Sequence, residues 1–257
     1  MSHLSTRELS RRFVAADGTS VQALDGTSIE IPSGTFVSII GPSGCGKSTL
    51  FNIIAGLDRP TDGQVLLAGE DRTGQQGLVG YMLQKDLLLP WRTVLGNVVL
   101  GLEIAGVGKK ERQSLARRFL EHYGLAGFED HYPAQLSGGM RQRAALLRTI
   151  LFNREVVLLD EPFGALDALT RAQMQEWLLD LWDDLGKTVL FVTHDIDEAI
   201  YLSDVVYVMS PRPGRIVARI DIDLDRPRKP AIVTSSRFTR LKEHALELLG
   251  EHVAVAA

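Results

Sequence analysis

The sequence predicts an α/β fold with a mostly parallel central β-sheet. Three short runs, at residues 36–40, 156–159 and 188–192, are almost entirely apolar, as expected of strands that are buried on both faces. Segments in which apolar residues recur at helical spacing separate these runs. With 257 residues, 45% of them hydrophobic, the chain can bury a sizeable core, and we expect one large domain over residues 1–257.

Composition and charge exclude several classes of protein. The net charge of -4 gives no general case for binding nucleic acid. The single cysteine, Cys45, excludes a disulfide framework and fits a reducing cytoplasm. The chain contains no apolar run of about 18 residues and no signal-peptide core at its N-terminus, so we expect it neither to span a membrane nor to be secreted by itself.

Residues 4–31 predict an N-terminal antiparallel β-hairpin. Their polarity alternates, and Asp17-Gly18 supplies the turn signal. Phe13 lies just before this turn and has two interpretations: a strand core residue, which composition alone favours, or an aromatic face on which an adenine ring stacks. Further strands are predicted at Gly63–Leu67 and Leu78–Met82.

A phosphate-binding loop follows the strand at residues 36–40. It fits the pattern G-x-x-x-x-G-K-S, and its residues are Gly41, Pro42, Ser43, Gly44, Cys45, Gly46, Lys47, Ser48 and Thr49. A helical run over residues 50–55 completes the strand, loop and helix that the pattern requires. The glycines allow several N–H groups to point at one phosphate chain, Lys47 can reach the terminal phosphates, and the Ser48 hydroxyl suits Mg²⁺. We therefore expect a bound nucleoside triphosphate, and we interpret Cys45 as a small loop residue rather than a catalytic thiol.

An apolar segment follows Gln84. Residues 85–91 hold three leucines, Pro90 and Trp91, which is more apolar than a solvated loop needs. The segment is either an exposed loop that happens to be apolar or a docking surface for another subunit, with Leu87, Leu88, Leu89 and Trp91 as candidates. Residues 93–105 and 109–123 predict helices, the second with Leu115, Phe119 and Tyr123 packed in the core.

Two glycines stand at the start of a predicted helix over residues 140–152. Ser137 is a plausible N-cap, and Gly138 and Gly139 follow it directly. Each glycine inside a helix costs about 1 kcal/mol, so a simple cap would not use both. The pair would allow a phosphate to approach the backbone N–H groups closely.

Two carboxylates and a histidine follow apolar strands. Asp160 and Glu161 end the run at residues 156–159, and ligands of parallel sheets bind at this end of the strands. Asp160 can hold the metal through water, and Glu161 can accept a proton from an attacking water. His194 follows the strand at residues 188–192 and is predicted at the same edge, which favours a functional role over a structural one.

The C-terminal region predicts two late strands and a closing helix. The strands lie at residues 205–209 and 215–222, and the helix lies at about residues 235–249. Basic residues between Arg212 and Lys229 alternate with aspartates, so we interpret them as a solvated face. We expect the tail from Gly250 to be frayed.

In combination these features resemble the nucleotide-binding subunits of ATP-binding cassette (ABC) transporters. The resemblance runs from about residue 4 to about residue 230 and rests on features in a fixed order: the phosphate loop, Gln84, Leu136–Gln142 (LSGGMRQ), Val156–Glu161, Ala165-Leu166-Asp167 and His194. It implies a P-loop NTPase core at about residues 1–85 and 150–230, with an N-terminal antiparallel region. It also implies an inserted α-helical subdomain at about residues 86–149 that carries the signature.

The resemblance also implies a role for each site residue. Phe13 would stack on the adenine of ATP, Ser48 and Gln84 would meet Mg²⁺, and Asp160 would be a further metal residue. Glu161 would polarise the lytic water, and His194 would contact the γ-phosphate. In a head-to-tail homodimer, Ser137, Gly138 and Gly139 would cap the nucleotide of the opposite subunit, and Asp167 would connect the two sites.

Leu89-Pro90-Trp91 and Asp160–Arg171 (DEPFGALDALTR) resemble the importer branch for nitrate, sulfonates, taurine or pyrimidine precursors of thiamine. The implied partners are a second copy of the chain, transmembrane permease subunits and, indirectly, a solute-binding protein, with the chain at the cytoplasmic face of the membrane. A soluble cassette ATPase of DNA repair or translation is the alternative. Such proteins usually carry two cassettes or a coiled-coil insertion, and this chain has neither. A P-loop kinase or GTPase would leave the signature and His194 unexplained.

Overall fold

The structure is a computed structural model that describes residues 2–254, with side chains described for residues 3–250. The chain divides into two compact units. Unit 1 comprises Met1–Leu78 and Gly186–Ala257, and unit 2 comprises Val79–Leu185. Within the described part of the chain, no helix is both long enough and apolar enough to cross a lipid bilayer.

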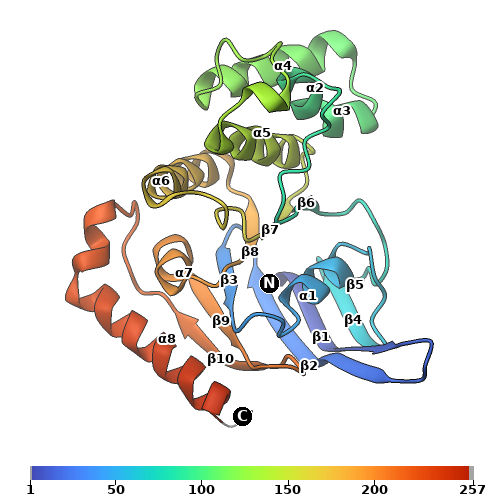
Figure 1. Ribbon diagram of the computed structural model, residues 1–257, viewed down its shortest axis with the longest axis vertical. Coiled ribbons are helices and arrows are strands. Elements are labelled where there is room, and N and C mark those ends of the chain that lie inside the picture. Colours follow the sequence, from blue (N-terminus) through green and yellow to red (C-terminus); the bar gives the residue numbers. More distant parts are fainter. Residues whose placement is uncertain (1, 255–257) are drawn as a thin grey trace. The chain divides into compact units, whose positions relative to one another are not determined.

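A buried parallel sheet forms the centre of unit 1. Strand β3 (Phe36–Ile40) lies between β8 (Thr188–Val192) and β9 (Val205–Met209) and runs parallel to both. Every residue of these three strands is buried, which explains why all but Ser38 and Thr188 are apolar. Strand β10 (Ile216–Asp221) pairs with β9 in the antiparallel direction. This sheet positions the loop after β3 and the loop after β8 at neighbouring carboxyl ends (Figure 1).

Three helices of unit 1 accompany this sheet. Helix α1 (Lys47–Ile54) follows β3, and α7 (Ile196–Leu202) follows β8. The C-terminal helix α8 (Ser236–Ala254), preceded by a 3₁₀ turn at Pro230–Thr234, packs against α7 and β9 (Figure 1). Helix α8 continues to Ala254, and residues 255–257 lie outside the described residues, so the fraying expected of the tail from Gly250 stays a prediction.

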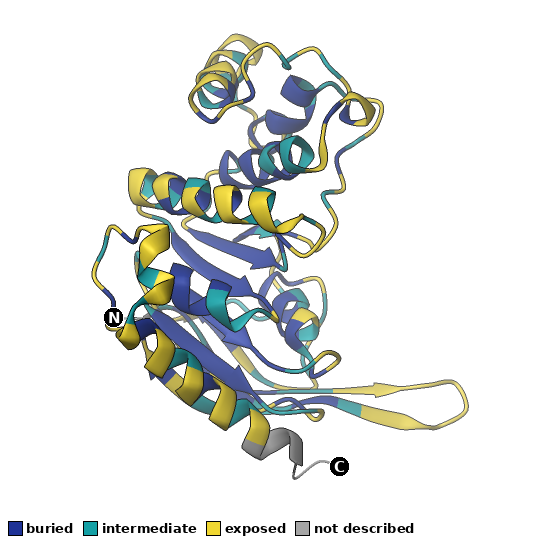
Figure 2. Cartoon of the chain, turned by 60° about the vertical axis from the view of Figure 1, so that its left-hand side comes forward, coloured by how far each residue is buried: buried dark blue, intermediate teal, exposed yellow. Residues whose placement is uncertain are grey.

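The predicted N-terminal hairpin is present in unit 1. Strands β1 (Ser2–Val14) and β2 (Ser20–Pro32) pair in the antiparallel direction, and β4 (Asp62–Leu67) and β5 (Glu70–Asp71) extend the sheet in the order β2-β1-β4-β5. Asp17 holds the turn because its Oδ1 accepts bonds from the N–H and hydroxyl of Thr19 (2.9 and 2.6 Å). The end of the hairpin near this turn is exposed on both strands (Figure 2).

Unit 2 combines two parallel strands with five α-helices among its described residues. Strands β6 (Gly80–Met82) and β7 (Val156–Asp160) pair. The helices are α2 (Val94–Val98), α3 (Leu100–Ile104), α4 (Lys109–His122), α5 (Gly138–Ile150) and α6 (Ala168–Leu185), with a 3₁₀ turn at Pro133–Gln135. Helix α5 contacts β6 and all four other helices (Figure 1). The proposed limits of a helical subdomain at about residues 86–149 stay a prediction.

The structure corrects two expectations for the helices of unit 2. The single helix expected at residues 93–105 is two short helices, α2 and α3, each weakened by one glycine, Gly96 or Gly101. In α4, Ala116 and Leu120 are fully buried, whereas Leu115 and Phe119 are only half-buried. The core face of α4 is therefore rotated by one residue from the predicted face, and only Tyr123 of the predicted trio is buried.

The solvated face predicted for the C-terminal basic residues is wrong at Arg228, which is only 6% exposed. Its Nη1 donates to the carbonyl oxygens of Ile200, Tyr201 and Ser203 (3.1, 3.0 and 2.7 Å) at the C-terminal end of α7. A cation at this position is favourable because the last carbonyl groups of a helix lack intrahelical partners and carry partial negative charge. Burial is the main reason that the pKa of Arg228 falls to about 10.

Candidate nucleotide-binding site

The phosphate loop in unit 1 depends on glycine at two positions. Gly46 is the N-cap of α1 with φ of +114°, and Gly44 has φ of +75°, so both occupy conformations that L-residues rarely adopt. A Cβ atom at Gly46 would lie 2.8 Å from Ala23 O and from Leu24 Cδ2. Any larger residue at position 46 would therefore displace β2 or the loop.

Lys47 is buried beneath the loop, with 6% of its surface exposed. Its Nζ donates to the carbonyl oxygens of Gly41 and Pro42 (2.8 and 2.9 Å) and lies 3.7 Å from Cys45 Sγ. Ser43, Gly44 and Ser48 remain exposed. The loop thus combines a desolvated ammonium with the first amides of α1, which lack intrahelical partners. This donor set fits a polyphosphate.

Cys45 is buried in the same loop. Burial raises the pKa of its thiol, and the charge of Lys47 opposes this effect only in part. A thiol whose pKa lies above its ordinary value is mostly protonated near neutral pH, and the thiolate is the nucleophilic form. These features agree with the interpretation of Cys45 as a small loop residue.

His194 lies in a loop of unit 1 that a buried hydrogen-bond network holds. The preceding Thr193 is 1% exposed, and its hydroxyl donates to Oε2 of Glu198 at 2.6 Å. The same hydroxyl accepts from the N–H of Asp195 at 3.0 Å, and Asp195 caps α7 by accepting from the N–H of Asp197 and Glu198. His194 itself is exposed at the end of β8, so its imidazole is accessible to a ligand.

In unit 2, Asp160 is the last residue of β7 and is only 6% exposed. The hydroxyl of Tyr81, on the neighbouring strand β6, hydrogen-bonds to it. Burial and the negative charge of Asp160 raise the pKa of Tyr81 above its ordinary range, so the phenol remains a protonated donor. Tyr81 therefore orients the carboxylate, a role that the sequence does not signal because Tyr81 there is an ordinary strand residue.

Glu161 follows Asp160 with an unusual backbone conformation. Its φ is +46°, which is the left-handed region, and this conformation costs a non-glycine residue on the order of 1 kcal/mol. The amide Nε2 of Gln84 donates to Glu161 Oε2 at 3.1 Å. Two of the predicted catalytic residues are thus in direct contact within unit 2.

The signature segment begins α5. Ser137 is its N-cap, with Oγ accepting from the N–H of Met140 at 3.3 Å, as predicted. Ser137 and Gly138 are exposed, and a Cβ atom on Gly138 would meet nothing closer than 3.9 Å. A Cβ atom on Gly139 would instead lie 2.9 Å from Thr170 Cγ2 of α6. Packing of α5 on α6 therefore accounts for Gly139, whereas the structure gives no packing reason for Gly138.

Asp167 lies directly before α6 and caps it. Its Oδ1 accepts from the N–H of Thr170 at 3.0 Å, and the hydrogen bonds from Thr170 lower the pKa of the Asp167 carboxyl. The neighbouring Leu169 is 72% exposed. Asp167 therefore has a local structural role, and the adjacent surface is open to a partner.

Phe13 is not a strand core residue, because it is 41% exposed near the end of β1. The guanidinium carbon of Arg11 lies 4.4 Å from the centroid of its ring. The interpretation of Phe13 as a core residue, which composition alone favoured, is therefore wrong. The hairpin extends beyond the part of unit 1 that could cover the ring. Arg11 was not singled out in the sequence, although its position two residues before Phe13 on one strand places both side chains on the same face.

The predicted docking segment is exposed only in part. Trp91 and Leu87 are 72% and 51% exposed, whereas Leu88 is buried and Leu89 is half-buried. The buried Asn97 of α2 holds Leu89, because its side chain accepts from the N–H and donates to the carbonyl oxygen of Leu89 (2.7 and 3.1 Å). The prediction that Leu88 belongs to a docking surface is therefore wrong.

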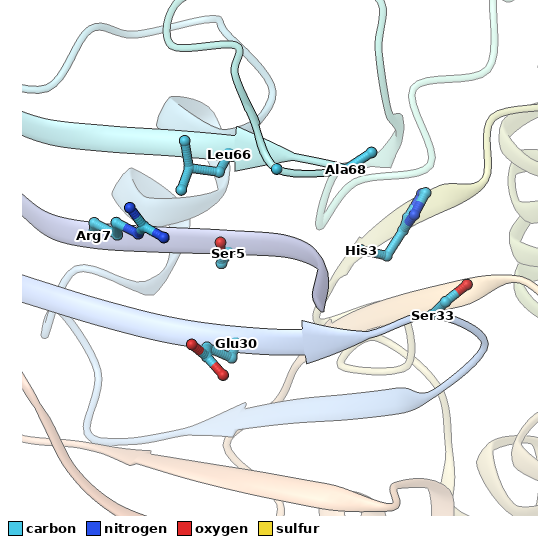
Figure 3. Close-up of a pocket in the computed structure, with 8 residues that line it drawn as sticks. His3, Ser5, Arg7, Glu30, Ser33, Leu66 and Ala68 are labelled. Atoms are coloured by element: carbon cyan, nitrogen blue, oxygen red, sulfur yellow. The ribbon is translucent and has the colours of Figure 1, made fainter. Parts of the chain in front are cut away.

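A separate pocket of about 440 Å³ lies on the antiparallel sheet of unit 1. Its lining includes His3, Ser5 and Arg7 from one face of β1, with Glu30 of β2 and Leu66 of β4 beside them (Figure 3). None of the predicted site residues lines this pocket. It therefore stands apart from the nucleotide-binding features.

Comparison with known proteins identifies the family. A family model described as ABC transporter matches residues 24–164, more than half of the chain. An uncharacterized ABC transporter ATP-binding protein of Methanocaldococcus jannaschii is 50% identical over 92% of this chain and 88% of its own length. A taurine import ATP-binding protein, TauB, of Rhizobium johnstonii is 47% identical over 92% of both chains.

Solved structures confirm the α/β cassette fold. A dimeric ATP-binding cassette in a post-hydrolysis state, bound to ADP and Pi, superposes with a TM-score of 0.75 and 32% identity, covering 86% of this chain and 100% of that one. A second dimeric structure of the same cassette has a TM-score of 0.74 at 31% identity. The chain therefore belongs to the ABC transporter family, as an ATP-hydrolysing nucleotide-binding subunit of the importer branch.

Proposed function

We propose that this chain drives the uptake of a small solute of the nitrate, sulfonate or taurine type, or of a pyrimidine precursor of thiamine. The observation that carries the proposal is its identity of 47% over 92% of the chain to a taurine import ATP-binding protein. In this proposal two copies form a head-to-tail dimer on transmembrane permease subunits at the cytoplasmic face of the membrane. A solute-binding protein delivers the solute to the permease.

The residues of the phosphate loop would bind the triphosphate of ATP. Lys47 supplies positive charge beneath the loop, and the amides at the start of α1 supply hydrogen-bond donors. Among the described residues, no group of three histidine, cysteine, aspartate or glutamate side chains could hold a metal ion. Ser48, in the loop of unit 1, would offer its hydroxyl to Mg²⁺, and Gln84 and Asp160 of unit 2 stay predicted metal residues. Mg²⁺ commonly keeps several waters and binds through the phosphates of its nucleotide.

Glu161 would act as the general base for the attacking water. Its carboxylate accepts a hydrogen bond from Gln84, and a carboxylate within hydrogen-bond reach of a water can take a proton from it. His194 would contact the γ-phosphate from a loop that Thr193 and Glu198 hold in place. Mg²⁺, when bound, would neutralise negative charge on the triphosphate as the γ-phosphoryl group passes to water and ADP leaves.

The signature would complete the site of the opposite subunit. Ser137, Gly138 and the N-terminus of α5 are exposed and offer backbone donors to a phosphate. Asp167 and the exposed Leu169 would lie in the dimer interface. In this arrangement each ATP is bound by one subunit and capped by the other, so hydrolysis requires two chains.

Trp91 and Leu87 would contact the permease. Both side chains are exposed on the segment that follows Gln84, and large exposed apolar side chains on one short segment favour a protein interface. Leu87 also has a left-handed backbone, with φ of +43°, and the carbonyl groups of Asp86 and Leu87 accept bonds of 2.7 Å from Arg148 of α5. Helix α5 thus carries both the signature and the support of the docking segment.

Reconstitution with the permease tests the proposal. The chain is expected to co-purify with the permease and, in vesicles that also contain the solute-binding protein, to drive ATP-dependent uptake. Mass spectrometry of the small molecule that the solute-binding protein retains identifies the solute class. Purification of the active chain with a soluble DNA-repair or translation complex, and without any membrane protein, would overturn the proposal.

A further inference from the structure

We propose that Arg11 is a positioning residue that holds the ring of Phe13 for the adenine of ATP. The inference rests on the proposed function, ATP binding by this chain, and on the adenine-stacking role that the family resemblance implies for Phe13. Arg11 would not touch the nucleotide. It would cover one face of the phenyl ring and thereby leave the opposite face for the base.

The contact between the two side chains has the geometry of a cation–π interaction. Arg11 and Phe13 are two residues apart on β1, and the guanidinium carbon lies 4.4 Å from the ring centroid. Arginine within about 6 Å of a ring centroid is attracted to the face of the ring. Since Phe13 remains 41% exposed, the ring has an arginine on one face and solvent access elsewhere.

Arg11 is itself fixed by Asp58. Its Nε donates to Oδ2 of Asp58 at 2.9 Å, and its Nη2 donates to Oδ1 at 2.8 Å, which is a bidentate pair. Only 24% of the arginine side chain and 25% of the aspartate side chain are exposed, so solvent screens this pair less than a fully exposed one. A planar guanidinium bonded at both of these nitrogens has little freedom to rotate.

Asp58 connects this pair to the helix that follows the phosphate loop. The N–H of Asp58 donates to the carbonyl oxygen of Asn52 in α1 at 3.1 Å. The contacts therefore run from α1 through Asp58 and Arg11 to Phe13, all within unit 1. A ring on an exposed hairpin would otherwise lose rotational freedom when the base binds, and a ring already held in place loses less.

Arg12 provides a matched control. It is the next residue on β1, carries the same charge and is exposed, but its Nε donates to Oε1 of Gln22 at 2.8 Å. The side chain of Arg12 thus bonds to β2, whereas that of Arg11 bonds to Asp58 and lies over the ring of Phe13. Replacing either arginine by glutamine removes one positive charge near Phe13, and only the replacement of Arg11 removes the stacked contact.

The test compares the binding of Mg-ATP and of Mg-tripolyphosphate, which has no base, to full-length variants by isothermal titration calorimetry. Arg11→Gln is expected to weaken ATP binding about two- to fivefold, the range of an exposed cation–π contact, and to leave tripolyphosphate binding unchanged. Arg12→Gln is expected to change neither. Phe13→Ala should weaken ATP binding on the order of tenfold, and adding Arg11→Gln to Phe13→Ala should cause no further loss.

Two results would overturn the inference while leaving Phe13 as the adenine residue. One is an affinity of Arg11→Gln for ATP that equals the affinity of Arg12→Gln for ATP. The other is an equal loss of ATP and tripolyphosphate binding in Arg11→Gln, which would indicate general damage to unit 1. A different result, unchanged ATP binding by Phe13→Ala, would overturn the adenine assignment itself and the role of Arg11 with it.

Discussion

Gln84 donates a hydrogen bond of 3.1 Å from its side-chain amide to Oε2 of Glu161, although the two residues are 77 positions apart in the sequence. Gln84 directly precedes the segment that carries Leu87 and Trp91, and Glu161 is the candidate general base. One hydrogen bond therefore connects the proposed docking segment to the proposed catalytic carboxylate. A displacement of that segment would change the surroundings of Glu161, which is a direct physical route for coupling.

Glu161→Gln is expected to bind ATP normally and to lose hydrolysis, because an amide cannot accept a proton from water. Loss of a general base lowers the rate on the order of 10²- to 10⁴-fold. Nucleotide binding and phosphate release measured on the same preparation separate the two effects. Glu176→Gln, which changes an exposed carboxylate on α6 of the same unit, should retain full activity. Near-normal hydrolysis by Glu161→Gln would assign the main catalytic role to His194 or another group.

The left-handed backbone of Glu161 predicts that glycine destabilises the protein less than alanine at this position, which is the reverse of the order expected within a helix. Glu161→Gly and Glu161→Ala both lose the bond to Gln84, but only glycine adopts φ of +46° without strain. The glycine variant should therefore be the more stable by about 1 kcal/mol in chemical denaturation. At Glu176, within α6, the order should reverse, since alanine favours a helix over glycine by about 1 kcal/mol. The same order at both positions would contradict the strain at Glu161.

Complementation between two inactive variants tests the head-to-tail dimer. Lys47→Ala removes the charge beneath the phosphate loop and should abolish ATP binding to its own loop. Ser137→Arg should block the exposed N-terminus of α5 and leave its own loop intact. In a mixed dimer, the Ser137→Arg chain supplies an unaltered phosphate loop and the Lys47→Ala chain supplies an unaltered signature. These two together form one intact site, so mixing the variants should restore part of the hydrolysis. Activity no higher than that of either variant alone would exclude a site completed by the partner.

Much of the fold could be predicted from the sequence because its central strands are almost entirely apolar. The predicted strands at residues 188–192 and 205–209 coincide with β8 and β9, since burial on both faces makes almost every residue in them apolar. Ser137 was predicted as an N-cap because the residue type and the following helix determine that role locally.

Features that depend on distant backbone groups could not be predicted. Arg228 is buried because the carbonyl groups at the end of α7 accept its hydrogen bonds. The spacing of charged residues in the sequence does not indicate where those acceptors lie. The exposure of Phe13 follows from the length of the hairpin beyond the core of unit 1, which residue type alone cannot indicate. The role of Glu161 as a base was argued from its position after a buried strand, and the roles of Gln84 and His194 on ATP come from family resemblance; all three stay predictions.

The final prediction concerns Trp91, which at 72% is more exposed than the other proposed permease contact, Leu87, at 51%. Because its side chain is largely in water, Trp91→Ala should change the free energy of unfolding by no more than about 0.5 kcal/mol and should leave ATP binding intact. Tryptophan anchors in interfaces commonly contribute about 2 kcal/mol or more, so the variant should bind the permease roughly 30-fold more weakly and lose uptake.

Leu57→Ala is the matched control for Trp91→Ala, because Leu57 is 56% exposed but belongs to unit 1. It should leave both assembly and uptake unchanged. Melting temperature and permease pull-down are measured on the same preparations. A large stability loss in Trp91→Ala with normal pull-down would contradict docking, because the tryptophan would then act by packing within unit 2. An unchanged melting temperature with weakened pull-down supports docking, because only a contact made in the complex can then account for the loss.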